Sequence, residues 1–200
     1  MDEEKVKDAI RVILKEIGED LEKEGIKFTP DRIARLYKNL FYGYTKKLKV
    51  VNEEERNGNL NENDIPITVF KNNSQEMLIR KVSCISHCMH HLSPFPLTVW
   101  VGIIPDKLLL GMNKIDRIVK YFSAKLQIQE NLTNEIADWI NNNIKPKGVI
   151  TVMKGVHFCA ELQGDSGDFT TSAVRGIFLK PEEGKTPKEE FLKLIDLNKE

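Results

Sequence analysis

The fold is decided by residues 111–148, which read GMNKIDRIVKYFSAKLQIQENLTNEIADWINNNIKPKG. Apolar residues recur at helical spacing in the first half of this stretch and again in the second half. They are Ile115, Ile118, Val119 and Phe122 in the first half, and Ile136, Trp139, Ile140 and Ile144 in the second. The stretch therefore predicts two successive amphipathic helices, each with an apolar face that has to be buried against another layer.

Segments that favour β-strands flank these two helices. Before them stand ITVF (67–70), MLIRKV (77–82) and PLTVWVGIIP (96–105). After them stand GVITVMKGVHFCAELQG (148–164) and TTSAVRGIFLK (170–180). All are rich in β-branched residues and partly alternate between apolar and polar positions. The order strand, strand, helix, helix, strand, strand predicts an α+β fold, in which an antiparallel sheet carries two helices on one face.

The N-terminal part of the chain has a helical pattern. Apolar residues at helical spacing over residues 3–24 predict one amphipathic helix. In the segment that follows, Thr29 is expected as the N-cap of a second helix and Pro30 as its first residue. At the other end of the chain, TPKEEFLKLIDL (186–197) predicts a short capped helix.

Residues 51–64, VNEEERNGNLNEND, carry almost nothing to bury and predict an exposed connector. We therefore expect a helical N-terminal region over residues 1–50, a connector over 51–65 and the main domain over 66–200.

Composition excludes several classes of protein. The chain has 200 residues, and its 30 basic side chains balance 30 acidic ones, so no overall positive field points to nucleic acid or to an anionic membrane. No apolar run is long enough to span a bilayer, and the acidic N-terminus has no apolar signal core. Three cysteines cannot all pair, and we expect the reducing cytoplasm, where clustered Cys and His indicate a metal or catalytic site.

All the cysteines and histidines lie in two short windows, CISHCMHH (84–91) and GVHFC (155–159). The Cys-x-x-His spacing of Cys88 and His91 lets a turn wrap a tetrahedral ion. If the second window is a strand, His157 and Cys159 share one face and address one site. A single Cys or His is more often an ordinary core residue, but the set predicts a metal site. Thiolate with imidazole favours Zn²⁺, although ligand type alone does not exclude iron.

The spacing leaves the type of metal site open. Four protein ligands, with Cys84 or His87 as the fourth, would form a structural zinc site. Three ligands would leave one position for water, which zinc turns into a nucleophile near neutral pH.

Three motifs taken together resemble the GTP cyclohydrolase I family. They are CMHHLSPF (88–95), GMNKIDRIVKYFSAKLQIQENLTNEI (111–136) and GVHFCAELQG (155–164). The family pattern has a Cys-Glu-His-His box, a Gly-Leu-Ser-Lys helix start, a Leu-Gln-x-Gln-Glu-x-Leu-Thr segment and a His-x-Cys strand. The similarity runs in order from about residue 30 to residue 180, and the combination is far more specific than any single motif.

The resemblance implies the tunnelling fold, in which antiparallel sheets of several subunits close into a barrel. It implies Zn²⁺ held by Cys88, His91 and Cys159, with His90 and His157 transferring protons. The implied reaction opens the imidazole ring of GTP at C8, releases formate and forms 7,8-dihydroneopterin triphosphate. This product can enter folate, pterin-cofactor or deazapurine synthesis. The implied assembly is a homodecamer of two stacked pentamers with sites at subunit boundaries.

The resemblance also implies the substrate contacts. Glu130 takes the place of the carboxylate that accepts hydrogen bonds from guanine N1–H and the 2-amino group, with Gln129 as its helper. Lys114 and Arg117 share a face near a helix start, where basic side chains and free N–H groups suit a triphosphate. Without the resemblance, both would be taken as an ordinary solvated basic face. Asn113 precedes Lys114 and is expected as a hydrogen-bonding N-cap.

The sequence departs from the family pattern at three positions. Met89 replaces the Glu of the Cys-Glu-His-His box, and Asn113 replaces the Ser before Lys114. Gln163 replaces the Arg that grips the triphosphate, and the loop GDSGDF (164–169) after it carries two acids. A neutral amide cannot supply the bidentate charged contact of a guanidinium. We therefore expect ring opening to persist, with triphosphate binding weakened or organised differently.

Two further interpretations follow from these departures. One is a variant enzyme that acts on another guanine nucleotide or stops at an early intermediate. The other is a non-catalytic homologue that keeps the fold and binds zinc or a nucleotide. The retained Cys and His residues argue against the non-catalytic homologue, whereas Met89 and Gln163 argue for it.

Overall fold

The computed structural model describes all residues except 56–57, 59, 74–75, 180–185 and 197–200. Its main sheet has the order β6-β3-β4-β7-β8. The bounds are β3 Leu78–Cys88, β4 Pro94–Ile104, β6 Leu126–Gln127, β7 Gly148–Val156 and β8 Asp168–Gly176. The four long strands pair antiparallel, and β6 adds a short parallel pairing at the end of β3. The predicted antiparallel sheet is confirmed.

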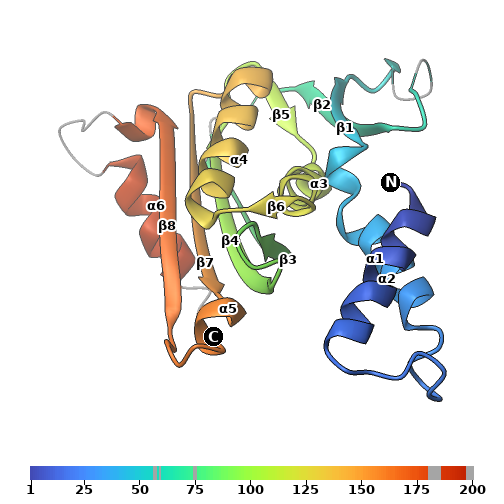
Figure 1. Cartoon of the computed structure of the whole chain (residues 1–200). Coiled ribbons are helices and arrows are strands. Elements are labelled where there is room, and N and C mark those ends of the chain that lie inside the picture. The colour runs from blue at the N-terminus through green and yellow to red at the C-terminus, as the bar shows by residue number, and fades with distance from the viewer. Residues whose placement is uncertain (56–57, 59, 74–75, 180–185, 197–200) are drawn as a thin grey trace.

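Two helices, α3 (Met112–Ser123) and α4 (Gln129–Ile144), cover one face of this sheet (Figure 1). Their apolar faces meet the alternating inward residues of the strands, such as Val99 and Val101, which are fully buried. The predicted α+β class, with two helices on one face of the sheet, is therefore confirmed. It is the arrangement that the tunnelling fold requires of each subunit.

The C-terminal helix α6 (Pro187–Asp196) packs over the opposite face. The predicted cap is present, because the Glu189 amide donates to Thr186 Oγ1 at 3.2 Å and the Thr186 amide donates to Glu189 Oε2 at 3.4 Å. Phe191 is fully buried and lies over Gly102, where any Cβ would come within 2.6 Å of its ring.

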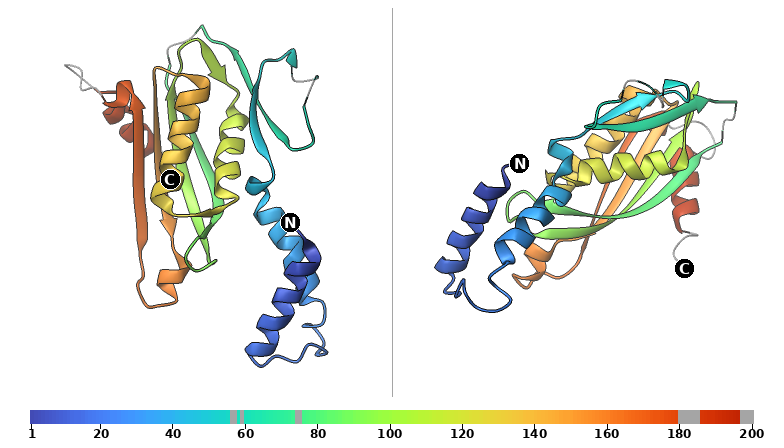
Figure 2. Two further views of the ribbon diagram at one scale, coloured as in Figure 1. Left: turned by 45° about the horizontal axis from the view of Figure 1, so that its top comes forward. Right: turned by 90° about the vertical axis from the view of Figure 1, so that its right-hand side faces the viewer.

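The N-terminal helices form a pair that stands to one side of the sheet (Figure 2). α1 runs over Glu3–Glu16, so the expected helix over residues 3–24 is eight residues too long. The chain turns at Gly18, whose φ of 87° is a left-handed value that favours glycine. α2 runs over Thr29–Leu40, and a 3₁₀ turn, η1 (Tyr42–Tyr44), follows.

Two of the expected helix caps are wrong. Phe28, not Thr29, occupies the N-cap of α2, and the Thr29 hydroxyl instead donates to the Gly25 carbonyl at 3.2 Å. Gly111, not Asn113, occupies the N-cap of α3. In both cases the helix starts one or two residues earlier than the side-chain chemistry predicted.

A second, smaller sheet has the order β1-β2-β5, with β1 Lys47–Val51, β2 Asp64–Lys71 and β5 Leu108–Leu110. β1 was not expected; it pairs parallel with β2, so the polar connector joins two paired strands. The division of the chain into regions 1–50, 51–65 and 66–200 stays a prediction.

The remaining short elements are α5 (Phe158–Glu161) and η3 (Ile177–Leu179). Among the described residues, no helix combines the length and the apolar character needed to cross a bilayer.

Candidate metal and catalytic site

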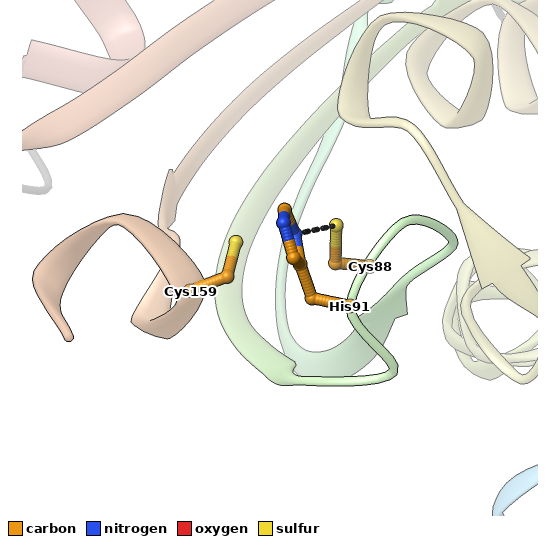
Figure 3. A group of neighbouring side chains, drawn as sticks. All are labelled: Cys88, His91 and Cys159. Atoms are coloured by element: carbon orange, nitrogen blue, oxygen red, sulfur yellow. Dashed lines mark hydrogen bonds between the residues drawn. The ribbon is translucent and has the colours of Figure 1, made fainter. Parts of the chain in front are cut away.

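The site forms where β3 and β7 end. Both strands pair antiparallel with β4, so they run in the same direction and finish at the same edge of the sheet. Cys88 is the last residue of β3, and the turn that follows carries His91. Beyond the end of β7, the short helix α5 brings Cys159 to the same place (Figure 3). Residues about 70 positions apart in the sequence thus become neighbours.

The second Cys/His window does not form the strand that we expected. β7 ends at Val156, His157 is the N-cap of α5, and Cys159 lies inside that helical turn. The two side chains therefore do not share one strand face. Cys159 reaches the first window because the chain turns at the end of β7.

The three potential ligands lie close enough together to share one metal ion. The sulfur and nitrogen atoms offered by Cys88, His91 and Cys159 all lie within 4.8 Å of one another. Cys88 Sγ is 3.6 Å from His91 Nδ1. Bond lengths of about 2.3 Å to sulfur and 2.0–2.1 Å to nitrogen give tetrahedral edges of roughly 3.5–3.8 Å. The donor set, two thiols and one imidazole, is the kind that zinc prefers.

The thiol of Cys159 has a raised pKa, first because of burial and then because it lies beside the Cys88 thiol. Two adjacent sulfurs resist carrying two negative charges unless a cation lies between them. The arrangement is thus one that a divalent cation would stabilise.

Cys84 and His87 stay outside this group. Cys84 Sγ lies 3.3 Å from Ser123 Oγ on α3, and burial raises the pKa of its thiol. His87 packs edge-on against Phe41, with ring centroids 5.1 Å apart, and burial lowers its pKa. Among the described residues, neither joins the group of potential ligands. The geometry favours a site with three protein ligands over a closed site with four.

His157 is held between aromatic rings beside the ligands. Its ring stacks on Phe95 at a centroid distance of 4.5 Å and an interplanar angle of 11°, and Phe169 stands edge-on at 6.4 Å. Burial lowers the pKa of His157, and the charge of Glu130 acts in the opposite direction. Glu130 is exposed at the start of α4, close enough to His157 for its charge to act on the ring.

His90 and Gln129 complete the immediate surroundings. His90 is exposed, and its Nδ1 lies 3.9 Å from Cys88 Sγ. Gln129 is fully buried, and its Oε1 lies 3.1 Å from Nε2 of His157. No sequence pattern pointed to Phe95 or Phe169, because aromatic residues in strands look like ordinary core residues before the strands are paired.

The comparisons with known proteins agree over the whole chain. The family model for GTP cyclohydrolase I matches residues 6–196. The chain belongs to the GTP cyclohydrolase I family. GTP cyclohydrolase 1 of Aquifex aeolicus is 38% identical over 198 residues, covering 98% of this chain and 97% of that protein. The Campylobacter jejuni protein of the same name is 39% identical over 202 residues, covering 99% and 98%.

Two further similarities complete the comparison. GTP cyclohydrolase 1 of Clostridium kluyveri is 37% identical over 198 residues, covering 97% of this chain and all of that protein. Among solved structures, the apo form of the archaeosine synthase QueF-Like superposes with a TM-score of 0.46 at 16% identity. That superposition covers 52% of this chain and 97% of the other.

The residues that the family resemblance assigns to phosphate lie at the other end of β3. Lys114 is buried and Arg117 donates to the Pro66 carbonyl at 3.1 Å, both within α3. This part of α3 lies beside Arg80, which is eight residues before Cys88 on β3, or roughly 26 Å along the strand. One chain of this GTP cyclohydrolase I family member therefore does not bring these two residues to its own Cys/His group.

Asn113 is exposed in the first turn of α3, beside Lys114. Gln163 is exposed near the Cys/His group, and its amide donates to the Cys159 carbonyl at 2.7 Å. These two departures from the family pattern thus lie at opposite ends of β3.

Two basic residues lie near Gln163 in the sequence, and both are already paired. Arg175 donates to Asp138 at 2.7 Å, and Lys154 forms an ion pair with Asp168. Neither therefore presents a free charge that replaces the missing arginine.

Proposed function

We propose that this protein is a zinc-dependent hydrolase that opens the imidazole ring of GTP, releases formate and forms 7,8-dihydroneopterin triphosphate. The observation that carries this proposal is the convergence of Cys88, His91 and Cys159 beside His157. Family membership supplies the reaction class, and the retained thiols and imidazoles supply the groups that the reaction needs.

In this proposal Cys88, His91 and Cys159 hold the metal through Sγ, Nδ1 and Sγ. A zinc ion bound there lowers the pKa of a water ligand and so supplies a nucleophile near neutral pH. The three ligands are a buried Cys, a partly buried Cys and an exposed His, so one side of the group is open to substrate. Because both thiols have to stay reduced, we place the reaction in the cytoplasm.

His90 and His157 are the proposed proton-transfer residues. Both lie next to the ligands, and imidazole both gives and takes protons at neutral pH. Glu130 is the proposed guanine anchor, because its carboxylate can accept from N1–H and the 2-amino group together. An adenine ring lacks this pair of donors and would leave the carboxylate unpaired.

The phosphate residues indicate an assembly. Lys114 and Arg117, with Asn113 beside them, lie at the far end of β3 from the Cys/His group of the same chain. If they bind the triphosphate, they have to come from another subunit. We therefore propose a homo-oligomer, a decamer of two pentamers, in which each site combines residues of neighbouring chains.

Zinc content tests the metal site. We expect about one zinc ion per chain in unchelated protein, and its loss in Cys88→Ser and Cys159→Ser, because two remaining ligands do not hold the ion. Cys84→Ser is the matched control, since it removes a partly buried thiol outside the ligand group. Zinc retained in both ligand variants, or lost in the control, contradicts the proposed ligand set.

Product analysis tests the reaction. Zinc-loaded protein is incubated with GTP, and both formate and the fluorescence of the oxidised pterin are measured. We expect both to rise together, and both to vanish in His157→Asn. Protein that holds zinc and yields neither product would be the non-catalytic homologue.

Gln163 supports a second candidate, a variant that prefers another guanine nucleotide. Its neutral amide is bound to the Cys159 carbonyl, where the family has a phosphate-binding arginine. GTP, dGTP and GDP are compared with product identification. A higher kcat/KM with GDP or dGTP than with GTP supports this variant over the principal proposal.

A further inference from the structure

A closed set of buried hydrogen bonds lies behind His157. The side chain of Gln129 has no exposed surface, and its Nε2 faces three acceptors. These are the Met153 carbonyl at 3.2 Å, the Phe169 carbonyl at 2.9 Å and Thr171 Oγ1 at 3.2 Å. The NH₂ group of Gln129 is therefore used inside the chain and is not free to donate to guanine.

The acceptors fix which way the amide points. Backbone carbonyls can only accept, so the NH₂ group of Gln129 has to face Met153 and Phe169. The flipped amide would set its oxygen against two carbonyl oxygens and leave buried donors unpaired. Oε1 of Gln129 consequently faces His157.

This orientation decides where His157 carries its hydrogen. Oε1 of Gln129 can only accept, and it lies 3.1 Å from Nε2 of His157. Nε2 therefore carries a hydrogen and donates it. In the neutral ring Nδ1 is then the bare nitrogen, because Nε2 already carries the hydrogen that it donates to Gln129.

Three features keep this geometry in place. Thr171 Oγ1 lies 2.6 Å from Thr133 Oγ1, and Thr133 donates to the backbone carbonyl of Gln129 at 2.7 Å. Thr171 is therefore connected through Thr133 to the first turn of α4. The stacked Phe95 ring fixes the plane of His157. Gly155 leaves room for the amide, because a Cβ there would lie 2.6 Å from Oε1 of Gln129.

We infer that Gln129 is a positioning residue, which holds His157 in the Nε2–H tautomer so that protons are exchanged at Nδ1. This inference rests on the proposed function and deepens it, because it states through which atom His157 acts. Gln129 then acts on the reaction through His157 and does not bind guanine itself.

The first test reads the tautomer directly. Sedimented protein with ¹⁵N-labelled histidine rings is studied by solid-state NMR, in which protonated and bare ring nitrogens differ in chemical shift. His157→Asn assigns the His157 signals among the four histidines. We expect wild-type His157 to have a protonated Nε2 and a bare Nδ1. A bare Nε2 in the wild type overturns the inference, and this measurement depends on no other variant.

Two variants then separate positioning from packing. Gln129→Met keeps the length of the side chain and removes the acceptor, so we expect His157 to populate both tautomers. Thr171→Val is the matched control, since it removes a buried hydrogen bond of Gln129 but leaves both carbonyl acceptors. We expect it to keep the wild-type tautomer. An unchanged tautomer in Gln129→Met, or the same change in both variants, overturns the inference.

Kinetics supply the second readout. A positioned acid–base group contributes about 10²–10⁴-fold to a rate, so we expect kcat of Gln129→Met to fall roughly tenfold to hundredfold. KM should change less than about twofold, because Gln129 does not touch the substrate. A rise in KM with unchanged kcat would instead make Gln129 a substrate contact. If the wild type shows no GTP activity, the proposed function fails, whereas the NMR result still decides the tautomer.

Discussion

Single residues at the ends of two strands create the site. Cys88 ends β3, and Cys159 follows the end of β7 by three residues. His157 lies between the end of β7 and Cys159, where its ring is stacked on Phe95 and its pKa is lowered by burial. A strand end is a suitable place for such groups, because side chains there can converge without interrupting the pairing of the sheet.

Gln163 gives a prediction at the same scale. Gln163→Arg restores a guanidinium beside the proposed phosphate path, shortly before the acids Asp165 and Asp168 in the sequence. We expect KM for GTP to fall roughly threefold to tenfold, with kcat little changed, because a charge-assisted contact adds to substrate binding.

Gln163→Met is the control, since it keeps the length of the side chain and adds no charge. It should leave KM within about twofold of the wild type. Equal KM values for the wild type and Gln163→Arg would show that phosphate is not bound near this residue.

At the scale of elements, an ion pair fastens α3 to β3. Arg80 donates to both carboxylate oxygens of Asp116, at 2.7 and 2.9 Å. The pKa of Asp116 is lowered, first by its hydrogen bond to Arg80, while burial acts in the opposite direction. Because the side chain of Arg80 is 43% exposed, solvent screens the pair and we expect only a small contribution to stability.

The lowered pKa sets the pH dependence of this contribution. Ionised Asp116 is stabilised in the folded state, so the contribution is complete above the unfolded pKa of about 4 and is lost as the pH falls through the lower folded pKa. We expect Asp116→Asn to unfold more easily at pH 7 and to approach the wild type below about pH 4.

Denaturant unfolding at one protein concentration, repeated from pH 7 to pH 3, measures this difference. Asp106→Asn is the matched control, because Asp106 is exposed on the turn between β4 and β5. If the wild type is more stable than Asp116→Asn by the same amount at every pH, the effect comes from packing and not from the charge of Asp116.

At the scale of the whole molecule, the two halves of the proposed site lie at opposite ends of the long strand β3. Cys88 and the other potential ligands are at its end, and Lys114 is beside its beginning. In the proposed assembly a single chain therefore holds two incomplete sites, and neighbouring chains combine them into complete ones.

Mixed oligomers test this arrangement. Cys159→Ser removes a metal ligand and Lys114→Met removes a phosphate contact, so each variant alone should be inactive. Reassembled from equal amounts of both chains, the oligomer should recover about one quarter of the wild-type activity. Each site needs an intact Cys159 from one chain and an intact Lys114 from its neighbour, and each of these is present in about half of the cases. The activity is measured as pterin fluorescence after oxidation.

Two control mixtures accompany this test. Cys159→Ser chains mixed with His157→Asn chains should recover little, since both residues lie at the same end of one chain. Wild-type chains mixed with chains that carry both Cys159→Ser and Lys114→Met show whether subunits exchange. If subunits exchange but neither the test mixture nor the Cys159→Ser/His157→Asn mixture recovers activity, each chain uses its own Lys114.

Local patterns predicted much of the fold. The periodicity of residues 111–148 gave both helices on the sheet, and the alternation of the flanking segments gave the long strands. Helix ends were less well predicted, because α1 stops at Glu16, where the chain turns, although apolar residues continue to Leu21. The parallel pairing of β1 with β2 was missed, because a short strand has no signal until its partner is known.

The sequence by itself determined the donor chemistry of this protein, because two thiols and an imidazole at Cys88, His91 and Cys159 prefer zinc wherever they meet. Only the tertiary structure decided that they meet, since that depends on β3 and β7 ending at one edge through their common neighbour β4. It also decided that Gln129 faces His157 rather than the open side of the site. The physical reason is that strand pairing and burial are set by contacts between distant parts of the chain, whereas ligand type and helical spacing are local properties.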